Sequence, residues 1–122
     1  MEVFDGSIDR PCTSQDLTRL KYLDCCVKEA LRRHPSAPLI RRKVSENVQL
    51  GKYTVPAGTT VSILIYALHH NEDHFPDPDS FKPERFLPEQ SAGRHPYAFI
   101  PFSAGSRNCI GILSYFSNQT TI

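Results

Sequence analysis

The sequence of 122 residues contains no tryptophan, one methionine and six glycines, and its formal net charge is only +1. A charge so close to zero gives no electrostatic basis for binding nucleic acid. The longest apolar run, Val61 to Leu68, contains a serine and is far shorter than the roughly 20 residues that span a bilayer. The segment from Met1 to Asp5 has neither the basic nor the apolar part of a secretory signal. We therefore expect no nucleic-acid partner, no membrane anchor and no signal peptide in this chain.

Cysteine is also sparse. The four cysteines, at positions 12, 25, 26 and 109, form neither a C-x-x-C pair nor the dense framework of a small secreted protein. This spacing argues against a structural zinc site and favours a reducing environment. We expect no native disulfide.

A cluster of histidines offers a second possible metal site. His70 and His74 are four residues apart, so they would share one face of a helix, and His69 is adjacent. However, Pro76 follows closely and biases the residue before it away from helical geometry. We interpret this segment as a solvated loop rather than a dedicated metal site.

Apolar spacing predicts a helix over residues 14–33, with Thr13 as its N-cap and Asp16 in its first turn, ended by Pro35. Residues 38–44 are expected to be extended, and residues 47–50 and 53–55 to form a hairpin whose turn begins with Gly51. Residues 59–66 read as a strand that is apolar on both sides, which suggests burial in a layered structure. Residues 69–101 are dense in proline and charge, and we expect no regular element there except one short turn near residues 78–81.

The most informative segment runs from Phe102 to Gly111, where one cysteine lies between two glycines. Gly105 can adopt positive φ in a tight turn, and Gly111 lets the backbone approach a bulky group. Arg107 offers a fork of donors to a carboxylate, and Phe102 is placed to shield the sulfur of Cys109 from water. The pattern predicts a loop that presents a thiolate to a metal. The alternative is a structural cysteine that behaves as a small buried apolar residue.

The pattern F-x-x-G-x-R-x-C-x-G resembles the haem-ligand signature of the cytochrome P450 monooxygenases, and all five fixed positions match. The resemblance implies that the Cys109 thiolate is the axial ligand of the haem iron. Arg42 and Arg107 would meet the haem propionates. The full set of cofactor-binding residues that it implies is Arg42, Phe102, Gly105, Arg107, Cys109 and Gly111. Ser106 stands where the family often has proline.

Two further motifs occur in the order and spacing of the same family. Residues 29–32 resemble its E-x-x-R element, and residues 83–86 resemble its P-E-R-F element. From the sequence alone, Glu29 and Arg32 are three residues apart and form at least an ordinary exposed helical pair. The resemblance implies instead that Glu29, Arg32 and Arg85 form a buried structural network that locks the irregular segment before the cysteine loop against the helix.

The resemblance covers residues 2–111, and residues 66–69 and 94–105 are similar to family 4, whose members hydroxylate fatty acids. It implies an α+β fragment of the mainly-α cytochrome P450 fold, with a K helix, a small antiparallel hairpin plus a strand, an irregular meander and the cysteine-ligand loop. On this basis residues 1–122 are part of one cytochrome P450 domain, and residues 112–122 are a divergent tail, uncharged and poor in helix formers. The family's oxygen-activating helix and membrane anchor have no counterpart in this sequence, so no catalytic residue is assigned.

For the intact enzyme, the resemblance implies haem b, electrons from NADPH through a separate reductase, a fatty-acid-like substrate and the endoplasmic reticulum membrane. This chain would lie on the reducing, cytosolic face. The leading hypothesis is a haem-binding C-terminal portion of such an enzyme, inactive by itself. Two alternatives stay open: a non-enzymatic haem-binding or interaction isoform, and an unstable truncated product whose strand edges are exposed.

Overall fold

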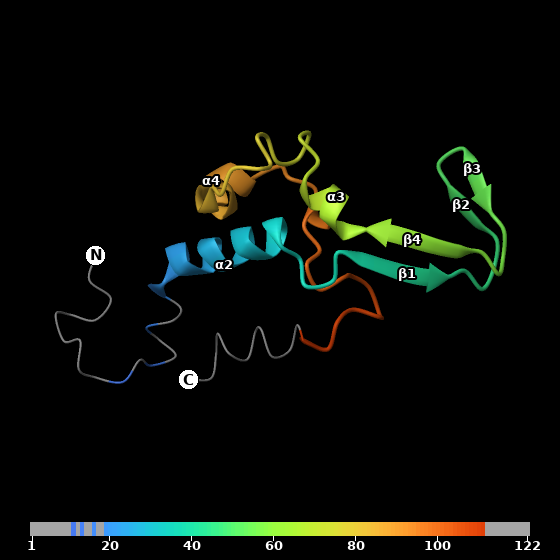
Figure 1. Ribbon diagram of the computed structural model, residues 1–122, viewed down its shortest axis with the longest axis horizontal. Coiled ribbons are helices and arrows are strands. Elements are labelled where there is room, and N and C mark those ends of the chain that lie inside the picture. The colour runs from blue at the N-terminus through green and yellow to red at the C-terminus, as the bar shows by residue number, and fades with distance from the viewer. Residues whose placement is uncertain (1–10, 12, 14–15, 17–18, 112–122) are drawn as a thin grey trace.

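The structure of the chain is a computed structural model, and it describes residues 11, 13, 16 and 19–111. In Figure 1 a helix on the left points with its C-terminal end toward an extended pair of strands on the right, and a small hairpin lies at the far end of the strands. In chain order the elements are the helix α2 (Lys21–Arg33), the strands β1 (Leu39–Lys43), β2 (Val48–Leu50), β3 (Tyr53–Val55) and β4 (Thr60–Leu64), the helix α3 (Ile65–His69), the 3-10 helix η1 (Pro83–Phe86), the helix α4 (Pro88–Ser91) and the 3-10 helix η2 (Pro96–Ala98). The tail predicted at residues 112–122 lies outside the described residues.

The segment before α2 carries the predicted cap. The Thr13 hydroxyl accepts from the Asp16 backbone N–H at 3.4 Å, and the Asp16 carboxylate accepts from the Thr13 N–H at 2.9 Å, which is a reciprocal capping arrangement. The prediction of one unbroken helix is wrong, because Leu20 has ψ of 50° and lies at the N-cap of α2. An apolar residue at a cap leaves the apolar periodicity intact, so the break has no sequence signal. The C-terminal end is as predicted, at Arg33, two residues before Pro35.

The strands form two separate two-stranded antiparallel sheets. β2 pairs with β3 across a turn in which Gly51 has φ of 58°, as the sequence predicts. β1 pairs with β4, with Arg42 opposite Val61. The prediction that β4 is buried on both sides is wrong for this chain, because Ile63 and Leu64 are 37% and 53% exposed. No second layer among the described residues covers this sheet.

The end of β4 leads directly into α3, which corrects the predicted strand limits. Ile65 and Tyr66, which we assigned to the strand, are helical. Ile65 and His69 are four residues apart and both are fully buried, so the short helix turns one face inward. The four residues from Ile65 to Leu68 are all apolar or aromatic. Apolar composition alone does not distinguish a strand from a buried helical turn, so the sequence does not show where the strand ends.

The proline-rich segment contains more regular structure than predicted. A turn closes near the expected place, where the Ser80 N–H donates to the Asp77 carbonyl at 3.2 Å. The expectation of no further element is wrong, since η1, α4 and η2 all lie in this segment. Each of these three elements begins with a proline at its first position, which suits a helical N-terminus because proline has fixed φ and no N–H to satisfy.

The core lies where α2, α3 and η1 meet, and it is unusually polar. The largest fully buried side chains among the described residues are Arg32, Phe75, Ile65, His69 and Glu29. Burial of charge on this scale requires paired and hydrogen-bonded groups. Across the described part of the chain, no helix has the length and apolar character needed to cross a membrane.

Candidate functional site

The cysteine loop, residues 102–111, projects its sulfur outward. Cys109 is exposed, and the loop is closed by a hydrogen bond of 2.8 Å from the Cys109 N–H to the Phe102 carbonyl. The Gly111 N–H donates to the Cys109 Sγ at 3.3 Å. The sulfur is therefore held by a backbone donor without being buried. The alternative of a buried structural cysteine is therefore wrong for Cys109.

The two glycines of the loop have different reasons to be glycine. Gly105 has φ of 83°, a conformation that side chains disfavour. Gly111 has no such constraint, but a Cβ there would lie 3.3 Å from the Cys109 Sγ. A side chain at this position would therefore crowd the sulfur.

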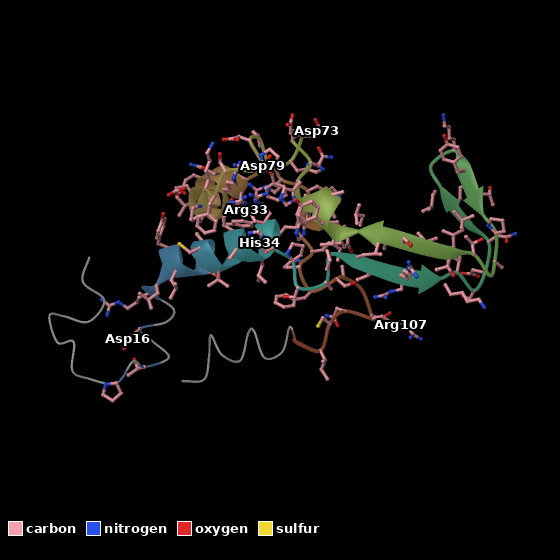
Figure 2. All side chains as sticks on the ribbon, viewed as in Figure 1. Asp16, Arg33, His34, Asp73, Asp79 and Arg107 are labelled. Carbon is pink, nitrogen blue, oxygen red and sulfur yellow. The ribbon has the colours of Figure 1, made fainter. Side chains whose placement is uncertain are left out.

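Arg42 brings β1 to the cysteine loop, although the two are far apart in sequence. Its guanidinium donates to the Arg107 carbonyl at 3.0 Å and to the Ser103 hydroxyl at 3.4 Å. Figure 2 shows Arg107 on the side of the loop that faces β1. The Arg42 guanidinium thus lies against the same loop that carries Arg107 and Cys109, and a guanidinium group can bind a carboxylate through two parallel hydrogen bonds.

A second set of charges lies behind the loop, in the core. Arg32 and Glu29 are fully buried and form a two-point ion pair, with Arg32 Nε and Nη2 each 2.8 Å from one carboxylate oxygen of Glu29. Arg32 also donates to the carbonyls of His69 at 3.0 Å and Pro78 at 2.7 Å. The Lys82 N–H donates to Glu29 at 2.9 Å. The exposed-pair interpretation of Glu29 and Arg32 is therefore wrong.

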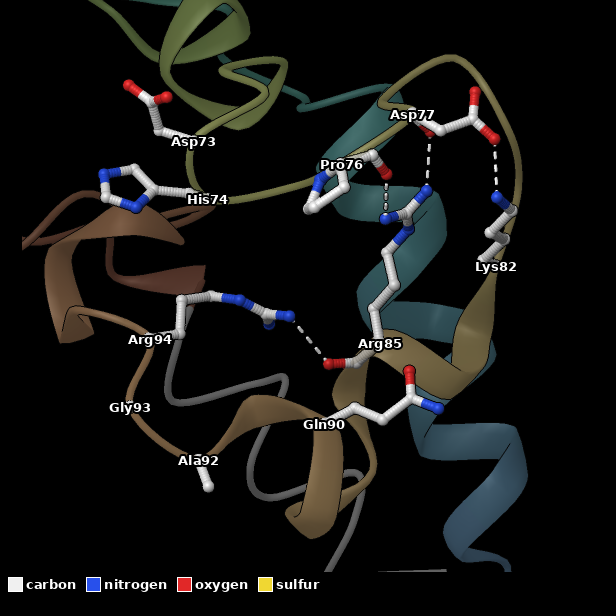
Figure 3. Close-up of a pocket in the computed structure, with 10 residues that line it drawn as sticks. All are labelled: Asp73, His74, Pro76, Asp77, Lys82, Arg85, Gln90, Ala92, Gly93 and Arg94. Atoms are coloured by element: carbon white, nitrogen blue, oxygen red, sulfur yellow. Dashed lines mark hydrogen bonds and ion pairs between the residues drawn. The ribbon is translucent and has the colours of Figure 1, made fainter.

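Arg85 completes the set of three residues. Its Nε lies 3.5 Å from the Glu29 carboxylate, and its two terminal nitrogens donate to the carbonyls of Pro76 and, at 2.6 Å, Asp77 (Figure 3). The structure thus brings Glu29, Arg32 and Arg85 together. Both arginines use their remaining donors on carbonyls of residues 69–78, so the charges fasten this irregular segment onto α2.

Arg94 is a member of this region that the sequence did not single out. Its guanidinium carbon lies 4.5 Å from the centre of the Phe75 ring and 5.3 Å from that of Phe86, and it donates to the Arg85 carbonyl at 2.8 Å. Burial, and then the nearby charge of Arg85, lower its pKa. Figure 3 shows that Arg85 and Arg94 line an open cavity of about 550 Å³ between residues 73–82 and 90–94. Cations stacked on aromatic faces stabilise this wall.

His69 is a further residue of this region, and the sequence prediction for it is wrong. We interpreted it as part of a solvated loop, but its ring is fully buried and its Nε2 accepts the Ile100 N–H at 2.9 Å. The signal that could have found it is its position four residues after Ile65 in an apolar run. His70, by contrast, is partly exposed and its ring stacks on Tyr66.

The remaining cysteines do not resemble Cys109. Cys25 is buried in α2, where desolvation in the first place raises the pKa of its thiol, and Cys26 is half-buried on the same helix. Cys12 lies outside the described residues. Among the cysteines that the structure describes, Cys109 is the one held in a loop with its sulfur exposed.

The sequence is similar to that of known proteins over most of its length. The family model described as Cytochrome P450 matches residues 2–113. Over 110 residues the chain is 58% identical to Cytochrome P450 4V2 from Mus musculus, and over 106 residues it is 55% identical to Cytochrome P450 4V2 from Homo sapiens. Cytochrome P450 4c3 from Drosophila melanogaster is 51% identical over 109 residues. These matches cover 90%, 87% and 89% of the chain but 21%, 20% and 20% of the relatives, so the chain spans about a fifth of their length.

Proposed function

This chain belongs to the cytochrome P450 family, and we propose that it forms the haem-binding portion of a family 4-like monooxygenase, with Cys109 as the ligand of the haem iron. The supporting observation is the exposed Cys109 sulfur, which accepts the Gly111 N–H in a loop that Arg42 contacts through the Arg107 carbonyl. When bound, haem b would supply the redox-active iron, and the thiolate would push electron density that favours O–O cleavage.

The residues present fit such a group. The hydrogen bond from the Gly111 N–H to the Cys109 Sγ would reduce the negative charge that the sulfur donates to the iron. Hydrogen bonds made to a metal ligand by surrounding groups tune metal sites in this way. Gly111 keeps the space beside the sulfur clear. Arg42 and Arg107 would bind the two propionates, while Phe102 would exclude water from the ligand and Gly105 would shape the turn.

The other residues of the proposed unit are structural. In this proposal α2 is the K helix, residues 70–101 are the meander, and Glu29, Arg32 and Arg85 are the network that joins them. Most of their donors and acceptors are engaged with each other or with backbone groups, so we assign them to the frame of the cofactor loop and not to the reaction.

The wider activity of the intact enzyme is proposed from the family. It would insert one oxygen atom of O2 into an aliphatic substrate such as a fatty acid, with electrons from NADPH through a reductase, at the endoplasmic reticulum membrane. The described residues offer a cysteine sulfur and its frame, while the resemblance places the family's proton-delivering acid and alcohol pair on a helix that has no counterpart in residues 1–122. We therefore propose that residues 1–122 by themselves are a partial cytochrome P450 domain without monooxygenase activity.

Replacement of Cys109 tests the proposal directly. The chain, or a longer protein that contains it, is reconstituted with haem and reduced under carbon monoxide, and the absorption band of thiolate ligation is measured. Cys109→Ser should abolish that band, because serine is a poor ligand for haem iron. Cys26→Ser, which changes a half-buried cysteine on α2, is the matched control and should keep it. A thiolate band of unchanged intensity in Cys109→Ser would contradict the assignment.

A further inference from the structure

We propose that His69 is a positioning residue for the cysteine loop: its buried ring accepts the Ile100 N–H and so fixes the point at which the chain passes from the ion network into that loop. This inference rests on the proposed function of the loop as a haem-ligand loop. The role of His69 is separate from the ion pairs, since it depends on a neutral ring acting as an acceptor.

The geometry places His69 between two regions. In Figure 1 the segment after η2 runs past the junction of α3 and α2 and continues beneath β1. The His69 ring packs there against Phe99, with ring centres 5.1 Å apart, and its Nε2 lies 2.9 Å from the Ile100 nitrogen. The contact spans 31 residues of sequence, so it is a tertiary contact of the kind that sets the path of a loop.

The same residue is tied to the ion network through its backbone. Arg32 donates to the His69 carbonyl at 3.0 Å, while the His69 side chain accepts from Ile100. Beyond Ile100, its carbonyl accepts the Ser103 N–H at 3.0 Å, and the Phe102 carbonyl accepts the Cys109 N–H at 2.8 Å. A short series of hydrogen bonds thus joins the buried arginine to the start and the end of the cysteine loop.

This role requires one specific form of the ring. Nε2 accepts the hydrogen bond from the Ile100 N–H, so the neutral ring must carry its own hydrogen on Nδ1. Burial, together with the charges of Arg32 on α2 and His70 on its own helix, lowers the pKa of His69 to about 4. The ring is therefore neutral at pH 7 and available as an acceptor.

Two substitutions separate the acceptor from the bulk of the ring. The side-chain oxygen of glutamine can reach the place of Nε2, whereas asparagine reaches only the place of Nδ1. His69→Gln should therefore restore the bond to Ile100 and His69→Asn should not. The 122-residue chain is labelled with ¹⁵N, and amide hydrogen exchange is measured at Ile100, at Cys109 and, as an internal control, at His34 in the C-terminal turn of α2.

In the wild-type chain we expect a ring protonated on Nδ1 and a protected Ile100 amide. His69→Gln should leave exchange at Ile100 within about threefold of wild type, and His69→Asn should accelerate it about tenfold or more, because a buried donor loses its acceptor. Exchange at His34 should change less. If His69→Asn unfolds entirely, wild-type exchange in His69→Gln still supports the proposal. Equal acceleration in both variants, an unprotected wild-type Ile100 or a ring protonated on Nε2 would overturn it.

A second readout uses the haem-loaded protein. His69→Asn should lower the share of bound haem that shows the thiolate band, and His69→Gln should restore it. The exchange experiment needs no haem, so the two proposals fail separately. Loss of the Cys109 assignment leaves the Ile100 result standing, whereas a Cys109-dependent band that neither His69 variant changes would overturn the positioning role.

Discussion

The ion network and the cysteine loop contrast sharply in how their groups are satisfied. Glu29 and Arg32 are fully buried and make hydrogen bonds to the backbone of His69, Pro78 and Lys82. In the loop, Cys109 is exposed and the neighbouring Ile110 is 84% exposed. The ion network is buried and hydrogen-bonded like the core of a folded protein. The cysteine loop is exposed, like a surface that binds a partner.

The difference shows which part of the chain carries its own stability. Charges as deeply buried as Glu29 and Arg32 are tolerated only when each finds its partners, and here those partners lie within the described residues. The loop leaves apolar and sulfur surface open, which favours contact with an apolar group such as a haem face.

The largest effect is expected from Glu29→Ala. This change leaves Arg32 buried without its carboxylate partner, and removing one partner from a buried ion pair costs on the order of 3–5 kcal/mol. We expect the urea unfolding midpoint of the chain to fall accordingly, and a longer parent protein to be recovered without haem. Normal haem content with slower turnover would contradict the structural role of the network.

The matched control lies on the same helix. Asp24 pairs with Lys28 at 2.6 Å, but both side chains are about one third exposed. Exposed i,i+4 pairs contribute only about 0.3–0.5 kcal/mol, so Asp24→Ala should leave the unfolding midpoint nearly unchanged. If Asp24→Ala and Glu29→Ala were equally damaging, burial would not be the cause.

The contrast also explains what the sequence could predict. The hairpin at Gly51, the end of α2 before Pro35 and the cap at Thr13 follow from local chemistry, and the structure confirms them. The loop around Cys109 follows from the spacing of a few residues. Each of these features depends only on residues that are close together in the sequence, so the sequence alone is enough to predict it.

Features that depend on distant partners were harder to predict. The break at Leu20 leaves the apolar spacing unchanged, and η1, α4 and η2 are short turns stabilised by contacts rather than by a repeating pattern. The burial of His69 depends on Ile100, which is 31 residues away. The pairing of β1 with β4 likewise joins residues separated by a whole hairpin.

An intermediate effect on the free energy of unfolding is expected from pH, through the titration of His69. Its pKa is about 4 in the folded chain but ordinarily 6.5. Between pH 6.5 and pH 4 the His69 side chain is protonated in the unfolded chain but not in the folded chain. The free energy of unfolding therefore falls as the pH drops from 6.5 to 4. Below pH 4 this group causes no further loss, because it is protonated in both states. The total is on the order of 3 kcal/mol.

The variant His69→Gln isolates this contribution, because glutamine does not titrate. Urea unfolding of both proteins is measured at intervals from pH 7.5 to pH 4, roughly the range over which histidine changes charge. The wild-type chain should lose stability more steeply than His69→Gln between pH 6.5 and pH 4. Parallel curves for the two proteins would show that His69 is not buried as a neutral ring.

The smallest effect is expected on the loop side, from Arg42→Ala. Arg42 is an exposed residue whose bonds to Arg107 and Ser103 are the contacts of its side chain with the cysteine loop. Hydrogen bonds that water can replace contribute little, so global unfolding should be unaffected while amide exchange in residues 103–109 accelerates about two- to fivefold.

Arg41→Ala is the control, because alternation along β1 turns that exposed side chain to the other face. Haem should suppress the difference if propionates bind Arg42, because the bound group would then hold the loop in place of the lost bonds. Equal exchange in Arg41→Ala and Arg42→Ala without haem would mean that β1 does not support the loop.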